Sequence, residues 1–584
     1  MNSSLELGRR TRRRRSRSWL WLIFLLFLAS AAATAWWAWT ETEQPNTEHI
    51  VPSYLSAPHP IMLNGEWLKA YSLGEGEGLQ IPLEVGQKLV GDGIRYEQET
   101  DSVILTTKSH VLHFKIGVLN ATMNQQPFTL QFAAVKEGEI VYLPLAPLKE
   151  LFGFRTEVDA DTGIVTLFAP GQALQPAEVA RHPKSPNASV PLRDGPGIAH
   201  PIVEDMAIGS VMRIWGEQDG WYRAQSTSGQ LGYVAKQDAV LLTPRTLPEP
   251  PDEEPFTAWQ ATGKRINLTW EAIYNVKADP KKIGELAGVN VVSPTWFELV
   301  DDTGTIRSKA DASYSEWYRA RGVQVWALFS NGFEPERTEQ ALATYETRLE
   351  MIRQLLAYAK TFKLQGINLD FENVKTSDKE NLVQFVRELT PLAHEQNLVI
   401  SIDVTPKSNS EFWSVFLDRA RLGQTVDYMM VMAYDEHWAS SPVAGSVSSL
   451  SWAESSIRRI LQEDKVPAEK LVMGLPLYTR LWTEAPDGKG GIKVTSKAIG
   501  MNAAASLIAE KKLQPTFSEE IGQHYVEFKE GDATQKIWIE DAVSIEARMK
   551  LAKKYNLAGV ASWARSFASN DIWQVMDQHL QSRP

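Results

Sequence analysis

An alternation of apolar strands with amphipathic helices fills residues 260–584 of this 584-residue chain. Helical patterns such as 345–362 and 379–396 separate the strands, with apolar residues recurring every three to four positions. Eight such units predict an α/β fold, a (β/α)8 TIM barrel whose active site lies at the C-terminal ends of its strands. The predicted strands are 265–270, 289–297, 323–330, 366–372, 398–404, 426–434, 471–478 and 559–564.

The interval 479–558 is too long for the single helix that would join the last two strands. It contains HYVEFKEGDATQKIWIED (524–541), in which two strand-like runs flank a turn, as in a β-hairpin. We therefore predict a small α+β insertion at about 479–545.

Charge is distributed unevenly along the chain. The formal net charge is −11, yet residues 1–18 hold seven arginines and one acid, Glu6, so they carry +6 and the rest carries −17. The next 21 residues, 19–39, are uncharged and would form a helix of about 31 Å, enough to cross a bilayer. Tryptophans at both ends and arginines before the run predict a transmembrane signal anchor in the cell membrane. The basic tail would then be cytoplasmic, with a spacer (40–59) and the catalytic region outside.

A cleaved signal peptide is the alternative, because Ala33-Thr34-Ala35 is an acceptable cleavage site and would release a secreted chain near Ala35. Nucleic-acid binding by the basic tail is set aside because the tail directly precedes the apolar run. The chain has no cysteine, which excludes disulfide scaffolds, thiolate zinc sites and cysteine nucleophiles.

Residues 60–170 read as short strands with turns between them. The runs 94–107 and 154–168 each have the pattern of a hairpin, and LPLAPLKELFGF (143–154) predicts a short amphipathic helix that ends at Gly153. The segment resembles the copper amine oxidase N-terminal-like domain of bacterial wall proteins, although it offers no His-rich copper site. Wall contact and a purely structural role both remain open.

Two linkers flank a second small β-rich module. Residues 171–190 are rich in Pro, Ala and Ser, and residues 244–259 are proline-rich and acidic, which favours an extended linker. Between them, 191–243 has about five short strands with GWY at 220–222 and GYV at 232–234. This pattern resembles a bacterial SH3 domain, and the resemblance implies binding to the cell wall.

The fourth predicted barrel strand lies in QGINLDFENV, residues 365–374. Side chains alternate along a strand, so Asn368, Asp370 and Glu372 share the face that points into the barrel. A buried parallel strand is normally apolar on both faces, and buried polar groups cost several kcal/mol unless they are paired or used. Structural ion pairing is the alternative, but this column indicates a functional site.

Glu372 and Asp370 lie about 6.7 Å apart along the strand, with Glu372 nearer the mouth of the barrel. A neighbouring anion and partial burial both raise the pKa of a carboxyl group, which suits Glu372 to act as a general acid. Spacing alone leaves the reaction open, because paired carboxylates serve several kinds of glycosidase.

Residues 365–372 resemble the DGxDxDxE signature of glycoside hydrolase family 18, and the resemblance extends over about 260–584. It is closest to the bacterial spore-cortex-lytic and wall-processing branch, as carried by 432–438, 443–452 and 474–482. The resemblance implies substrate-assisted, retaining hydrolysis of a polymer that contains β-1,4-linked N-acetylglucosamine, with no cofactor and no metal.

The resemblance also assigns individual roles. Glu372 would protonate the glycosidic oxygen and then act as base for the incoming water, and Asp370 would orient the substrate acetamide. Tyr434 would hydrogen-bond the acetamide carbonyl, Asp435 would contact the sugar, and Trp563 would stack beneath it, with core packing as the alternative for this tryptophan.

Two departures from the signature stand out. Gln365 and Asn368 replace its first two aspartates, and the SxGG element of strand three reads SNG at 330–332. We expect Asn368 to lie in the substrate-binding site and to hydrogen-bond Asp370, although an amide cannot share a proton as a carboxylic acid would. On this hypothesis Asp370 stays ionised over a wider pH range and raises the pKa of Glu372.

Aromatic side chains are plentiful, since more than half of the 20 tryptophans lie in the barrel region. Trp296, Trp438 and Trp482 are predicted near strand ends as cleft walls that bind substrate, with ordinary packing as the alternative for each.

Three functions remain open from the sequence. The first is a membrane-anchored, extracytoplasmic glycosidase that acts on peptidoglycan or its fragments. The second is a chitinase or chitooligosaccharide hydrolase. The third is a non-catalytic, lectin-like wall-binding protein, which the presence of Glu372 disfavours.

Overall fold

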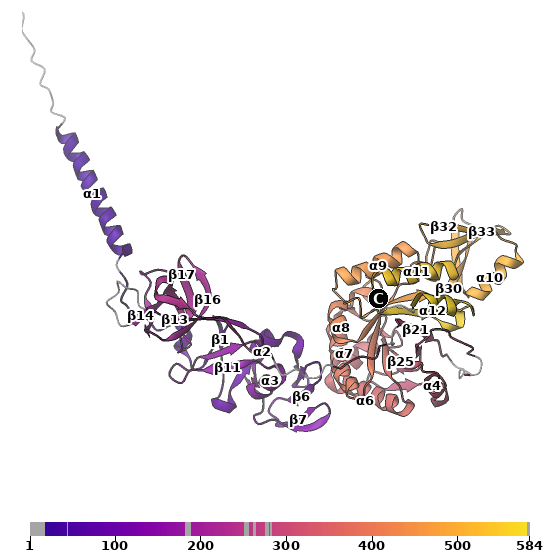
Figure 1. Ribbon diagram of the computed structural model, residues 1–584, viewed down its shortest axis with the longest axis horizontal. Helices are drawn as coiled ribbons and strands as arrows, with labels where there is room; N and C mark the ends of the chain where they lie inside the picture. Colours follow the sequence, from indigo (N-terminus) through magenta and orange to yellow (C-terminus); the bar gives the residue numbers. More distant parts are fainter. Residues whose placement is uncertain are drawn as a thin grey trace, which may run out of the picture. The chain divides into compact units, whose positions relative to one another are not determined.

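The computed structural model divides the chain into two compact units (Figure 1). One consists of residues 1–91 and 131–251, the other of residues 92–130 and 252–584. The residues that the structure describes are 18–43, 45–180, 189–249, 256–260, 264–274, 280 and 283–580.

Helix α1 (Ser18–Glu43) includes the apolar run predicted to cross a membrane. Its large apolar side chains, among them Trp19, Leu26 and Trp37, are exposed. Within the described part of the chain, no helix combines the length and the apolar character that a membrane span requires. The predicted span at 19–39 is therefore not supported by the described residues, and the basic tail lies outside them up to residue 17.

Eight parallel strands close into a barrel in the second unit. They are β21 (Ile266–Glu271), β22 (Val291–Pro294), β25 (Gln324–Ser330), β26 (Gly366–Asp370), β27 (Val399–Val404), β28 (Tyr428–Met432), β29 (Leu471–Pro476) and β35 (Gly559–Trp563). Their order is β22-β21-β35-β29-β28-β27-β26-β25, and β22 pairs with β25 to close the ring. All eight predicted strands are confirmed, although the run 289–297 is divided between β22 and the short β23 (Phe297–Leu299).

Helices surround the barrel because each strand buries apolar side chains on its outer face. Ile367 and Leu369 of β26, for example, pack in one apolar core with Leu355, Val386 and Leu389 of two helices. The helices of this unit, apart from the insertion, are α4 (Ala312–Arg319), α5 (Pro335–Ala343), α6 (Tyr345–Phe362), α7 (Lys379–His394), α8 (Arg419–Thr425), α9 (Leu450–Gln462), α11 (Ala542–Lys554) and α12 (Ile572–Leu580).

The insertion after β29 is a five-stranded sheet with one helix. Its elements are β30 (Tyr478–Pro486), β31 (Ile492–Gly500), α10 (Met501–Glu510), β32 (Thr516–Ser518), β33 (Gln523–Glu530) and β34 (Ala533–Ile539). Strands β33 and β34 form the predicted hairpin, and Val526, Ile537 and Ile539 form the core beneath it. The α+β insertion is therefore confirmed.

A five-stranded antiparallel sheet belongs to the same unit as the barrel, although the sequence placed it in a domain at 60–170. Its strands are β4 (Ile94–Glu97), β5 (Ser102–Thr106), β6 (Val111–Lys115), β7 (Asn120–Met123) and β8 (Gln126–Thr129). Glu97 of this sheet accepts a hydrogen bond from the buried guanidinium of Arg348 on α6, at 2.7 Å. The predicted domain is thus divided between the two units.

The first unit contains the SH3-like sheet, with strand order β15-β14-β18-β17-β16-β13-β19. Its strands are β13 (Ala173–Val179), β14 (Ser189–Arg193), β15 (Ile202–Ala207), β16 (Val211–Gln218), β17 (Trp221–Gln225), β18 (Leu231–Ala235) and β19 (Ala239–Leu241). Strand β13 corrects the prediction of a linker at 171–190. Its Leu174, Ala177 and Val179 are buried, and the surrounding Pro and Ala concealed this strand pattern.

The remaining strands of the first unit form two small sheets. One has the order β11-β12-β1-β2 and the other β3-β10-β9. The helix predicted within 143–154 is present as α3 (Leu145–Phe152), and Gly153 ends it with φ 70°. These elements are β1 (Pro60–Leu63), β2 (Glu66–Tyr71), β3 (Gln80–Pro82), α2 (Leu83–Val90), β9 (Val135–Glu137), β10 (Ile140–Pro144), β11 (Arg155–Val158) and β12 (Val165–Phe168).

Candidate active site

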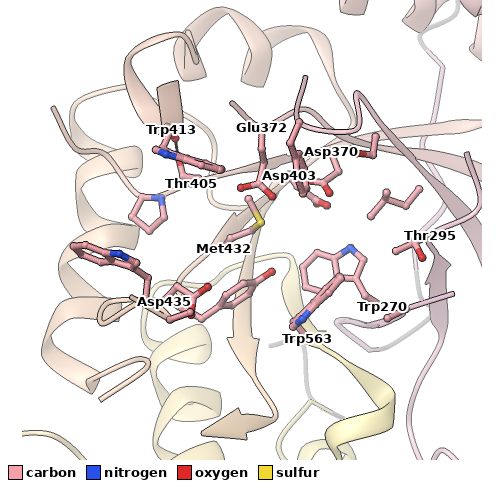
Figure 2. A pocket seen from close by; sticks show the side chains of 18 of the residues that line it. Trp270, Thr295, Asp370, Glu372, Asp403, Thr405, Trp413, Met432, Asp435 and Trp563 are labelled. Atoms are coloured by element: carbon pink, nitrogen blue, oxygen red, sulfur yellow. Dashed lines mark hydrogen bonds between the residues drawn. The ribbon is translucent and has the colours of Figure 1, made fainter. Parts of the chain in front are cut away.

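A cleft of about 1360 Å³ opens at the C-terminal ends of the barrel strands (Figure 2). Asp370 at the end of β26 and Glu372 just beyond it both line this cleft. The alternation predicted for this strand is present, because Leu369 and Phe371 pack outward in the core of the helix layer. The barrel therefore presents the two acids where parallel-barrel enzymes bind their substrates.

The backbone of Glu372 is fixed from the neighbouring strand. The side-chain amide of Asn331 donates to the carbonyl oxygen of Glu372 at 2.8 Å, and its Oδ1 accepts from the Glu372 N–H at 3.1 Å. Asn331 is fully buried and also donates to Thr338. The divergent SNG element of strand three thus positions the acid directly.

The environment of the acids favours their protonated forms. Burial raises the pKa of Glu372 well above its usual value, and the charges of Asp370 and Asp435 raise it further. Burial raises the pKa of Asp370 to about 7. Among the described residues, no lysine, arginine or histidine forms an ion pair with either group. A protonated Glu372 at the cleft surface can serve as a general acid.

Asn368 is placed differently from the prediction. It is fully buried, does not line the cleft, and its Oδ1 accepts from Trp270 Nε1 at 2.9 Å and from Ser293 Oγ at 3.0 Å. Its amide donates to Asp403 Oδ1 at 2.9 Å rather than to Asp370. Because it lies one layer below Asp370 in the barrel, Asn368 cannot bind substrate directly.

Tyr434 and Asp435 follow β28 and line the cleft, as predicted. The Tyr434 ring lies edge-on to Trp270, and burial raises the pKa of its hydroxyl, so that the group remains a hydrogen-bond donor. Asp435 Oδ1 accepts from the Tyr478 hydroxyl at 2.6 Å and from the Arg480 guanidinium at 3.0 Å. The sequence did not single out these two partners on β30, which hold Asp435 in place.

The four predicted tryptophans separate into two pairs. Trp563 and Trp438 line the cleft, and Trp438 is 53% exposed. Trp296 is instead buried against Tyr314, with ring centroids 5.5 Å apart, because it points outward into the helix layer. Trp482 lies on β30 of the insertion, where it is buried and donates to the Gly445 carbonyl at 2.8 Å. Neither buried tryptophan forms a cleft wall.

Trp413 is a cleft residue that the strand pattern did not reveal, because it lies in the loop after β27, on a short helical turn (Glu411–Val415). It is 46% exposed and lines the cleft. Arg419, which is buried, donates to the carbonyl oxygens of Thr405 at 2.8 Å and Ser414 at 3.2 Å, and so fixes this loop. An exposed ring on a rigid loop can stack on a sugar with little loss of conformational entropy.

Replacing Trp413 by alanine is expected to raise KM about tenfold and to leave kcat nearly unchanged, because the stacking surface is equally available before and during the reaction. The measurement is steady-state hydrolysis of oligosaccharides of increasing length. Phe412→Ala is the control, since Phe412 is exposed to a similar extent but lies outside the cleft. Equal KM values for the two variants would contradict a substrate-binding role for Trp413.

The described residues contain no group of three or more His, Cys, Asp or Glu side chains arranged to hold a metal ion. The chemistry available from these residues is proton transfer by carboxyl groups, hydrogen bonding by tyrosine and stacking by tryptophan. A parallel barrel that combines these groups in one cleft has the architecture of a carbohydrate hydrolase.

Comparison with known proteins identifies the family of that domain. Residues 321–568 match the glycosyl hydrolases family 18, residues 68–167 the copper amine oxidase N-terminal domain, and residues 187–238 the bacterial SH3 domain. The chain therefore carries a family 18 glycosyl hydrolase domain behind two smaller modules, and it is a glycoside hydrolase.

The similar proteins include bacterial glycosylases. The uncharacterized glycosylase YvbX of Bacillus subtilis is 27% identical over 302 residues, which are 49% of this chain and 84% of that protein. The cortical fragment-lytic enzyme of Bacillus subtilis is 25% identical over 43% of this chain, a match that spans only 58% of that enzyme. The crystal structure of the spore cortex-lytic enzyme SleL of Bacillus megaterium shares 20% identity, with a TM-score of 0.49, over 64% of this chain and 90% of that one.

Proposed function

We propose that this protein hydrolyses β-1,4 bonds in a polymer that contains N-acetylglucosamine, namely peptidoglycan or its fragments. The observation that carries the proposal is the column of Glu372 and Asp370 at the cleft floor, with Tyr434 also lining the cleft. The similarity to a cortical fragment-lytic enzyme and the bacterial SH3 domain support peptidoglycan as the polymer.

In the proposed mechanism, Glu372 gives its proton to the glycosidic oxygen as the bond to the anomeric carbon breaks. The carbonyl oxygen of the substrate's own 2-acetamido group forms the new bond to that carbon, giving an oxazolinium intermediate. Asp370 accepts a hydrogen bond from the acetamide N–H, and the Tyr434 hydroxyl donates a hydrogen bond to the acetamide carbonyl oxygen. Water then attacks the same carbon as the bond from that carbon to the acetamide oxygen breaks, which restores the 2-acetamido group, and the water gives a proton to Glu372. Two displacements at one carbon retain the anomeric configuration.

The two sides of Glu372 would hold the two sugars joined by the scissile bond. In the view of Figure 2, Trp413 lies on one side of Glu372, with Trp270 and Trp563 on the other. A general acid must stand at the oxygen between two sugars, so we assign the intermediate-forming sugar to Trp563 and the leaving sugar to Trp413.

Product analysis tests the substrate. The full chain in mild detergent is incubated with purified peptidoglycan and, separately, with chitooligosaccharides, and the products are identified by mass spectrometry. We expect muropeptides with new reducing-end N-acetylglucosamine. Cleavage of chitooligosaccharides alone would identify a chitinase instead, and binding without cleavage of either polymer would identify a lectin.

We further propose that residues 19–39 anchor the chain in the cell membrane, with the SH3-like module and the barrel outside. The uncharged run, its arginine-rich flank and the exposed apolar side chains of α1 support this. The expected result is that the intact chain stays in the membrane fraction after alkaline extraction. A mature chain that begins near Trp36 would instead identify a cleaved signal peptide.

A further inference from the structure

The loop at 433–437, directly after β28, carries Tyr434 and Asp435 into the cleft. Asp435 has a φ of 60°, which lies in the left-handed region that residues other than glycine seldom adopt. A backbone conformation of this kind persists only where the surrounding structure holds it. The place of the Tyr434 hydroxyl in the cleft therefore depends on the contacts that hold this loop.

A buried, serine-rich segment at 446–449 lies against the loop. The Ser448 hydroxyl donates to the carbonyl oxygen of Ala433 at 2.7 Å. The carbonyl oxygen of Val447 accepts from the backbone N–H of Glu436 at 2.9 Å. These two bonds hold the loop on both sides of its left-handed residue, and the serine bond acts on the residue that directly precedes the tyrosine of the cleft.

Ser448 is fixed in turn by a buried polar network that reaches α11. The guanidinium of Arg548 donates to the carbonyl oxygen of Ser448 and, at 2.7 and 2.9 Å, to the two oxygens of Glu540. Gln523 donates to the same carboxylate at 2.7 Å and accepts from the Ser446 hydroxyl. The Ser448 N–H donates to Ser446 Oγ at 3.0 Å. Ser448 is thus bonded through its N–H, its carbonyl oxygen and its hydroxyl, which gives the hydroxyl a defined direction.

We propose that Ser448 is a positioning residue: its hydroxyl fixes the Ala433 carbonyl oxygen and so places the Tyr434 hydroxyl where it meets the substrate acetamide. A shift of the backbone at residue 433 moves the tyrosine with it, and an error of about 1 Å in the position of a reacting group can cost about 100-fold in rate. The effect on catalysis rests on the proposed function, whereas the hold of Ser448 on the loop does not.

A matched pair of serine substitutions tests the proposal in the full-length chain. Ser448→Ala removes the hydroxyl that bonds to Ala433 and is expected to lower kcat about tenfold with less than about a twofold change in KM, because Tyr434 is needed as the acetamide oxygen approaches the anomeric carbon. Ser315→Ala is the control. The buried Ser315 hydroxyl on α4 also donates to a carbonyl oxygen, that of Phe362 at 2.9 Å, but Ser315 does not line the cleft. Equal kcat values for the two variants would overturn the proposal.

A double-mutant cycle separates positioning from a general loss of stability. Tyr434→Phe removes the hydroxyl through which Ser448 is proposed to act. Adding Ser448→Ala to Tyr434→Phe should therefore lower kcat by less than about twofold, in contrast to the tenfold loss expected in the wild-type background. If Ser448→Ala lowers kcat by the same factor in both backgrounds, Ser448 does not act through Tyr434 and the proposal is wrong.

Hydrogen exchange, measured by mass spectrometry, supplies a readout that needs no substrate. Ser448→Ala should speed the exchange of the amides at 433–437 about tenfold, whereas Ser315→Ala should leave their exchange as it is in the wild type. Unchanged exchange in the Ser448→Ala variant would also overturn the proposal. If the wild type cleaves none of the polymers, the proposed function fails, and the exchange rates still decide whether Ser448 holds the loop.

Discussion

Replacing Glu372 by glutamine is expected to lower kcat by about 10³-fold, because an amide has the shape of the acid but cannot protonate the leaving oxygen. The variant should fold normally, since Asn331 holds the backbone of residue 372 and not its side chain. The measurement is kcat on the polymer that the wild type cleaves, with the thermal unfolding midpoint recorded for both proteins.

The pH dependence of the wild type follows from the same group. Burial and two neighbouring acids raise the pKa of Glu372, so kcat should fall as the pH rises through that raised value, at a higher pH than an ordinary glutamate would give. For the Glu372→Gln substitution, the control is Glu339→Gln, because Glu339 is a surface glutamate paired with Lys375. A Glu372→Gln variant within tenfold of this control would exclude Glu372 as the general acid.

Replacing Arg348 by alanine is expected to destabilise the unit that contains the barrel by about 3–5 kcal/mol, the usual cost of removing one partner from a buried ion pair. The guanidinium of Arg348 is fully buried and donates to both oxygens of Glu388, at 2.9 and 2.7 Å, and to Glu97 at 2.7 Å. Its removal leaves the buried Glu388 without a cation among the described residues. Glu97 keeps only the partly exposed Arg95 as its partner.

Denaturant unfolding of the full chain measures this loss. Arg353→Ala is the matched control, since Arg353 lies on the same helix and contacts the same sheet through Gln125, but at an exposed position. Surface contacts of this kind contribute less than about 1 kcal/mol. If the two variants unfold at the same denaturant concentration, the buried network does not hold the sheet and the barrel together.

The strands and the two acids of the candidate site could be predicted from the sequence because both depend on local pattern. Each barrel strand is a short apolar run, and two acids on the inner face of one such run are anomalous enough to be noticed. The same reasoning, applied to LVISIDV (398–404), would have pointed to Asp403, an equally buried acid on the next strand.

Contacts between distant segments could not be read in this way. Whether Trp296 faces the cleft or the helix layer depends on how the chain turns after β22. Trp413 comes into the cleft on a short helical turn after β27, which the strand pattern does not include. Glu97 and Arg348 are 251 positions apart, and nothing in the sequence around either residue indicates its partner. The division of residues 60–170 between two compact units could not be predicted for the same reason, because a local pattern does not show which distant segment a strand packs against.

The sheet at 92–130 has a consequence for how the chain responds to proteolysis. Because this sheet packs with the barrel while the residues on either side of it belong to the other unit, the backbone passes between the units three times. A single cut in the proline-rich segment at 250–255 would therefore leave the barrel fragment attached without a peptide bond. The two fragments should separate on a denaturing gel and elute together from a size-exclusion column.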